Sequence, residues 1–224
     1  MSNDATTTGR TIEREPANTS ALDSAAFVAA AITFLAGGVM VIWASPPPSE
    51  SPVFGILAHG LWALAAALLA IGAIALVLSN GRLRRSLAGT LSIGALGLGV
   101  VVGLQWVTWA YVDLRAAEAD GYDLALETVI TPFGAGHLLM YAILIGGGVA
   151  LLAWALARTR AARRGLSLAG VAVGALTVGT AVLSTLAGLG GGSEGHWLFD
   201  VATLLIPLCY LWAMAVGIDL YRRS

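Results

Sequence analysis

Six apolar segments, each long enough to cross a lipid bilayer, constrain this chain more than any other feature of its sequence. They cover residues 25–44, 53–79, 87–112, 133–158, 166–189 and 195–219. A helix needs about 20 predominantly apolar residues to cross the roughly 30 Å of hydrocarbon in a bilayer. Only 11% of the 224 residues are charged, against about 25% in soluble globular proteins. The sequence therefore predicts an all-α, polytopic membrane protein folded as a six-transmembrane-helix bundle.

The residues ahead of the first apolar segment have a different character. They are polar and show no periodic apolar face, which is typical of a disordered segment. We therefore expect a disordered cytoplasmic tail at 1–24, followed by a transmembrane domain at 25–224. The first apolar segment exceeds the roughly 7–15 residues of the apolar region in a secretory signal, which predicts that it is retained as a helix.

The arginines predict the orientation of the six helices. All twelve basic residues are arginines, which is typical of a GC-rich prokaryotic genome. The clusters at 82–85, 158–164 and 222–223 fall on one side of a six-helix topology together with the tail, and the opposite side holds only Arg115. The positive-inside rule then places both termini in the cytoplasm. The expected location is the plasma membrane of a prokaryote.

Parts of the chain resemble one another. SPVFG at 51–55 precedes His59, TPFG at 131–134 precedes His137, and both helices end in an arginine cluster. The glycine-rich helices that follow also match, and His196 again lies at the start of a helix. We therefore expect three repeated helical hairpins, an arrangement that in transporters tends to place a site where the repeats meet. Chance similarity between Ala/Gly/Leu-rich helices is the alternative.

Small and aromatic residues in these helices have structural interpretations. GxxxG pairs let helix backbones approach closely, and two lie within the apolar segments: Gly99 with Gly103, and Gly170 with Gly174. Aromatic residues near the outer helix ends are typical of the belt at a membrane interface. These residues are Trp43, Trp106, Trp109, Tyr111 and Trp197. The wall of a haem or quinone pocket is the alternative interpretation.

The three histidines lie near the outer starts of even-numbered helices. At about 1.5 Å per residue, His59 and His137 lie about 10 and 8 Å below the starts of their helices, and His196 lies nearer the interface. Asp200 lies one helical turn below His196, on the same face. A carboxylate inside a membrane costs roughly 2.5–3.5 kcal/mol, so we expect Asp200 to face the bundle interior and to be functional.

Together these side chains have the composition of a metal site. Imidazoles with a carboxylate suit zinc, copper or iron, and histidine is also a common ligand of haem iron. We therefore predict an outer-leaflet site that binds a transition metal (Zn, Cu or Fe) or haem. The predicted ligands are His59, His137, His196 and Asp200, and the predicted polar lining residues are Gln105 and Glu194. For any one histidine, an interfacial hydrogen bond to the backbone or to water is the alternative.

Other functions are either without support or left open. The chain has one cysteine and no CxxC, GxSxG, HExxH or Walker motif, so no enzymatic reaction is predicted. No basic cluster is interleaved with aromatic residues, and the expected partner is the lipid bilayer, not nucleic acid. A proton- or ion-coupled transporter that uses Asp200 and His196, with a kink at Pro207, remains an alternative. A membrane subunit or scaffold without a site of its own is another. Asp219, near the last arginines, is most simply a surface ion-pair partner.

Overall fold

The computed structural model describes residues 21–43, 52–117, 131–189 and 194–223, and side chains within 21–40, 56–108, 136–188 and 197–223. The long helices are α1 (Ala21–Trp43), α2 (Pro52–Ser79), α4 (Leu87–Ala117), α6 (Thr131–Thr159), α7 (Arg164–Leu189) and α8 (Glu194–Tyr221). A single turn, α3 (Gly81–Arg84), connects α2 to α4. The described ranges contain no strand. Each predicted apolar segment coincides with one long helix, which confirms the all-α, six-helix prediction.

The surface of the bundle is apolar. Each of the six long helices is long and apolar enough to cross a membrane. Large apolar side chains are exposed around the bundle, among them Leu87 at 74% and Leu204 at 71%. An apolar surface of this extent is unfavourable in water and favourable in hydrocarbon. The protein is therefore a multi-pass membrane protein whose surroundings are lipid.

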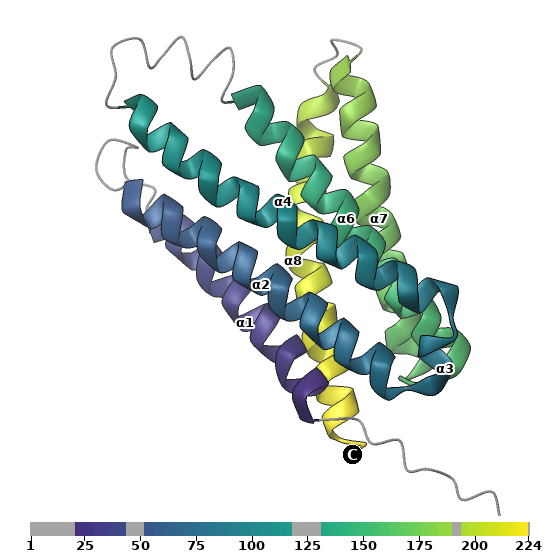
Figure 1. Ribbon diagram of the computed structural model, residues 1–224. Helices are drawn as coiled ribbons and strands as arrows, with labels where there is room; N and C mark the ends of the chain where they lie inside the picture. The colour runs from purple at the N-terminus through teal and green to yellow at the C-terminus, as the bar shows by residue number, and fades with distance from the viewer. Residues whose placement is uncertain (1–20, 44–51, 118–130, 190–193, 224) are drawn as a thin grey trace, which may run out of the picture.

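The helices form a closed ring. Each packs against its neighbours in sequence from α1 to α8, and α8 closes the ring against α1; α6 also contacts α8. The start of α1, the end of α8 and α3 lie at one end of the bundle, at the bottom of Figure 1. We call this the arginine end, because 82–85, 158–164 and 222–223 lie there. The opposite end, where α2, α6 and α8 begin, is the histidine end.

Glycines set the closest approaches between helices. A Cβ atom added to Gly174 in α7 would lie 2.7 Å from the backbone nitrogen of Ala150 in α6. One added to Gly99 in α4 would lie 2.8 Å from the side chain of Ile145 in α6. All four predicted GxxxG glycines face a neighbouring helix in this way: Gly99, Gly103, Gly170 and Gly174. Their predicted packing role is confirmed.

Both connections at the arginine end are ordered by backbone hydrogen bonds. The side chain of Asn80 caps α3 by accepting from the N–H groups of Arg82 and Leu83, at 3.1 and 3.3 Å. Helix α6 ends where Arg160 takes a left-handed conformation, with φ of 57°. The N–H of Ala161 then donates to the carbonyl of Leu156 at 3.2 Å, the long bond of a Schellman motif. This turn directs the chain after Arg160 toward α8.

Asp219 is buried at the arginine end, in contrast to the surface ion pair that the sequence suggested. Its side chain is 7% exposed. The Arg163 Nε lies 2.9 Å from Oδ1, and the backbone N–H of Arg163 donates to Oδ2 at 3.2 Å. The Arg223 guanidinium lies 3.0 Å from Oδ2. The carboxylate therefore ties the start of α7 to the end of α8, because the turn after α6 brings Arg163 across to it.

Helix α1 begins four residues before the predicted span, which places Asp23 inside its first turn. The Asp23 side chain is fully buried, and its Oδ1 accepts from the N–H of Ser24 at 2.9 Å. Its Oδ2 has no hydrogen-bond partner among the described residues. The first turn of a helix favours a negative charge. Residues 1–20 of the predicted tail lie outside the described ranges.

Candidate functional site at the histidine end

The structure describes the side chains of three of the four predicted ligands. His59 in α2 and His137 in α6 are half-buried. Asp200 in α8 is exposed. His196 lies in the first turn of α8, and its side chain is outside the described residues. The site is therefore built from His59, His137 and the residues around them.

A layer of aromatic rings from three helices lies beside His59. Its imidazole meets the ring of Trp62 in α2 and the ring of Trp106 in α4 edge to face, with centroids 5.3 Å apart in both cases. Trp106 also stacks on Tyr141 of α6, at 5.9 Å and an interplanar angle of 17°. Aromatic pairs at such distances contribute about 0.5–1.5 kcal/mol beyond the area they bury. Trp106 thus belongs to a half-buried layer of rings that packs between helices.

Tyr141 extends this layer into the centre of the bundle. Its hydroxyl donates to the carbonyl oxygen of Trp62 at 3.4 Å and lies 2.6 Å from the hydroxyl of Tyr210 in α8. Either hydroxyl could donate to the other; because the Trp62 carbonyl can only accept, we assign the Tyr141 proton to it and Tyr210 as the donor between the two tyrosines. Tyr141 and Tyr210 are 2% and 0% exposed, and Phe34 of α1 stacks on Tyr210 at 4.3 Å. Five helices therefore meet at these rings.

The two tyrosines also fix the relative depths of α6 and α8. His137 precedes Tyr141 by four residues, or about 6 Å, whereas His196 precedes Tyr210 by fourteen, or about 21 Å. Both helices start at the histidine end, and long side chains on helices lean toward the N-terminus. The backbone of His196 therefore lies about 15 Å further out than that of His137 along the helix axes. This register does not favour one layer of three histidines, which the sequence suggested.

His59 and His137 share a depth more closely. His59 precedes Trp62 by three residues and His137 precedes Tyr141 by four. The Tyr141 hydroxyl contacts the Trp62 carbonyl, so each histidine lies about one helical turn outward of the same contact. α4 packs against both α2 and α6, and its Trp106 lies against His59 and Tyr141. His59 therefore contacts this aromatic layer, and His137 lies one helical turn outward of it on α6.

Asp200 lies on the face of α8 that points away from the bundle. It precedes the fully buried Ala202 by two residues, which is about 200° around a helix. Trp197 and Leu204, which are three and four residues from Asp200 and so on the same side of α8, are 57% and 71% exposed. The interior orientation expected for Asp200 is thus not observed, because the residues of α8 that pack on the other helices lie on the opposite face. α8 continues through Pro207 without interruption.

The remaining candidate residues do not complete a cluster. Within the part of the chain whose side chains are described, no three His, Cys, Asp or Glu side chains are grouped so that they could hold a metal ion. Cys209 is buried, with its Sγ 3.5 Å from the hydroxyl of Thr177. Gln105, predicted as a lining residue, is exposed, and the side chain of Glu194 lies outside the described residues. A pair of histidines, rather than a set of three or more ligands, is the arrangement to consider.

Sequence reasoning missed the tyrosine pair and Trp62. A signal for Trp62 and Tyr141 was present in the sequence. In each of the first two predicted hairpins an aromatic residue follows a histidine by one helical turn, as Trp62 follows His59 and Tyr141 follows His137. Residues three or four apart stack on one helix face. Tyr210 has no such signal, because its role depends on the register of α8 against α6.

The fold and its surface define a multi-pass membrane protein formed by a closed ring of six helices. No protein-family model, curated protein or solved structure matches this chain. Its function is therefore inferred from the geometry of the histidine end alone.

Proposed function

We propose that this protein binds haem iron, or a single transition metal ion, at the histidine end, with His59 and His137 as the ligands. The observation that carries the proposal is the aromatic layer, which His59 contacts and which includes Tyr141, one helical turn inward of the half-buried His137. Haem suits such a pair best. Its iron takes one or two axial side-chain ligands, whereas zinc is usually held by three or four protein ligands.

The aromatic layer supports this proposal through the environment that it creates. Trp62, Trp106 and Tyr141 supply ring faces and edges of the kind that pack against a planar macrocycle. Below them, the buried rings of Tyr210 and Phe34 fill the bundle. Burial and low polarity around haem are among the factors that set its reduction potential. When bound, haem would supply one-electron chemistry, and the residues would orient it and keep water from its inner side.

The direction of the site in the membrane follows from charge. The arginine end holds nine described arginines and two described acids, Asp23 and Asp219. Positive residues favour the cytoplasmic side. We therefore place both termini in the cytoplasm of a prokaryotic cell and the two histidines in the outer half of its plasma membrane.

The alternative of a proton-coupled carrier receives less support from the same geometry. Its central residue, Asp200, lies on the outward face of α8 among exposed apolar side chains. A carboxylate in that position does not line a path through the ring of helices. A scaffold without a site of its own is the outcome that remains if metal and haem are both absent.

The test is spectroscopic and elemental. The protein is purified in detergent without chelators or a histidine tag, from cells supplied with a haem precursor, and its absorption spectrum and metal content are measured. We expect about one haem or metal ion per chain, since one pair of axial histidines holds one iron. His59→Ala and His137→Ala should each lose it, whereas His196→Ala and Asp200→Asn should retain it.

Two results would overturn the proposal. One is wild-type protein that contains no metal and takes up no added haem. The other is loss of the bound group in His196→Ala alone, which would move the ligands to α8. Circular dichroism of each variant distinguishes loss of the site from loss of the fold.

A further inference from the structure

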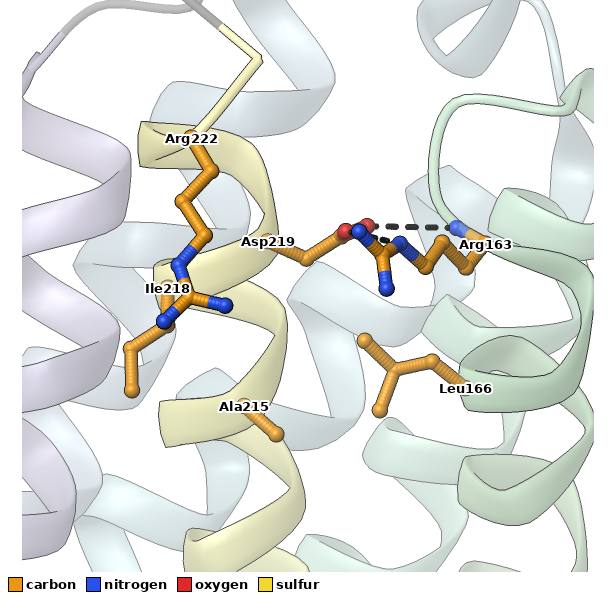
Figure 2. Close-up of a pocket in the computed structure, with 6 residues that line it drawn as sticks. All are labelled: Arg163, Leu166, Ala215, Ile218, Asp219 and Arg222. Carbon is orange, nitrogen blue, oxygen red and sulfur yellow. Dashed lines mark hydrogen bonds and ion pairs between the residues drawn. The ribbon is translucent and has the colours of Figure 1, made fainter.

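A groove at the arginine end lies between the start of α7 and the end of α8. Its volume is about 310 Å³, and its lining residues are Arg163, Leu166, Ala215, Ile218, Asp219 and Arg222. This volume is at the lower limit of typical ligand pockets, which begin at about 300 Å³. Figure 2 shows Arg163 reaching Asp219 from the α7 side, while Arg222 turns back along α8 beside Ile218. The groove is remote from the histidines, at the opposite end of the bundle.

The charge of this groove is positive. The lining residues Arg163 and Arg222 outweigh the single carboxylate of Asp219, which leaves a net charge of +1, and Arg223, ion-paired to Asp219, adds a third positive charge beside the groove. Asp219 is fully engaged, because both of its oxygens accept from arginine groups. The Arg222 guanidinium makes no hydrogen bond or ion pair within the described part of the chain. The N–H donors of the Arg222 guanidinium are therefore available to an anion.

The depth of the groove points to the lipid headgroup region. The candidate membrane spans of α7 and α8 are Arg164–Gly188 and Trp197–Tyr221. The groove therefore lies across the point where both spans meet the polar interface. Its arginines are at that boundary, and Leu166, Ala215 and Ile218 continue from them into the spans. An amphipathic molecule with an anionic head and an apolar tail matches this order of polarity.

We propose that this groove binds the phosphate of an anionic membrane phospholipid, with Arg222 and Arg163 as donors and the acyl chain against Leu166 and Ile218. Basic pockets between transmembrane helices recognise anionic headgroups by the same combination of charge and depth. Arg163 keeps its Nε on Asp219, so the carboxylate holds this arginine in place in the wall of the groove. A zwitterionic lipid is disfavoured, because its ammonium group would lie beside arginines.

The turn before α7 helps to hold the walls of the groove in place before a ligand binds. The left-handed Arg160 and the bond from Ala161 to Leu156 fix where α6 ends. At the next turn, the Trp212 indole N–H donates to the Leu166 carbonyl at 2.8 Å and joins α8 to α7. A groove whose walls are already held loses little conformational entropy when it binds a lipid.

The test counts bound lipid. The full-length protein in mild detergent is titrated with phosphatidylglycerol and, separately, with phosphatidylcholine of the same acyl chains, and lipid adducts are measured by native mass spectrometry. We expect phosphatidylglycerol to bind more tightly. Arg222→Gln should weaken its binding about tenfold, the effect of losing one hydrogen bond to a charged group. Arg84→Gln is the matched control, because Arg84 is exposed at the same end but lies on α3.

Three outcomes would overturn the proposal. Equal binding of the two lipids would show that charge does not select the ligand. Equal losses in Arg222→Gln and Arg84→Gln would show only a general effect of surface charge. Displacement of phosphatidylglycerol by inorganic phosphate alone would assign the groove to a soluble anion. None of these results depends on haem or metal at the histidine end.

Discussion

Replacing Tyr141 with phenylalanine should destabilise the bundle more than replacing Tyr210 with phenylalanine. Both substitutions remove one hydroxyl and keep a ring, so the stacks on Trp106 and Phe34 are retained. The two hydroxyls differ in their partners. Tyr141 contacts both Tyr210 and the carbonyl of Trp62, whereas Tyr210 has only Tyr141 as a hydrogen-bond partner among the described residues.

The magnitudes follow from that difference. Tyr141→Phe leaves the Tyr210 hydroxyl fully buried and unsatisfied, at a cost of about 1–3 kcal/mol. After Tyr210→Phe, the Tyr141 hydroxyl still donates to Trp62, so the loss is near the average for a hydrogen bond inside a membrane protein, about 0.6 kcal/mol. The double variant removes both hydroxyls, so it leaves no buried hydroxyl without a hydrogen-bond partner. It should therefore be more stable than Tyr141→Phe alone.

The free energy of unfolding is measured in mixed detergent micelles, by titration with sodium dodecyl sulfate and circular dichroism. The four proteins form a double-mutant cycle, which isolates the coupling between the hydroxyls. A Tyr210→Phe variant as unstable as Tyr141→Phe would refute the assigned donor and acceptor. So would two losses that simply add in the double variant.

Two further pairs of substitutions test the packing and the ion pairs. Gly174→Ala should lower the unfolding free energy by about 1–3 kcal/mol, because its Cβ would overlap the α6 backbone. Gly179→Ala, where a Cβ meets nothing within 4 Å, should be neutral or slightly stabilising in the same sodium dodecyl sulfate titration. Asp219→Asn should cost about 1.5–3 kcal/mol through its bonds to Arg163 and Arg223, and added salt should reduce the difference. Asp200→Asn, on the outward face, should change stability by less than about 0.5 kcal/mol; equal effects of the two asparagines would contradict the burial of Asp219.

The spans could be predicted because bilayer thickness demands long apolar runs, and each run corresponds to one helix. The inward face of each helix is harder to predict. Lipid tails are as apolar as leucine, so the hydrophobic pattern does not separate a face toward lipid from a face toward the core. For this reason the sequence predicted an inward face for Asp200, whereas the structure places it on the outward face of α8. The glycines at Gly99 and Gly174 were predicted correctly because close backbone approach depends on side-chain size and not on polarity.

The depth of a residue along the membrane normal is also hard to predict from sequence. Counting residues from the start of each helix places His137 and His196 in one layer only if α6 and α8 begin at the same height. The contact of Tyr141 with Tyr210 favours different heights for the two helix starts. Asp219 is a related case, because its burial depends on a turn at Arg160 with positive φ, a conformation that arginine seldom adopts. Such long-range features are properties of the packed bundle and leave little trace in local sequence.

The closure of the ring by α8 has a consequence for how the protein is made. A ribosome delivers α1 to the membrane before the other five long helices and α8 after them, so the two partners of the closing contact are made about 150 residues apart. Until α8 arrives, Phe34 lacks the tyrosine ring on which it stacks, and the flank of α1 that α8 will cover faces lipid or a chaperone. Contacts between segments so distant in sequence form late and slowly. The contact that closes the ring is therefore also the one that completes the centre of the bundle.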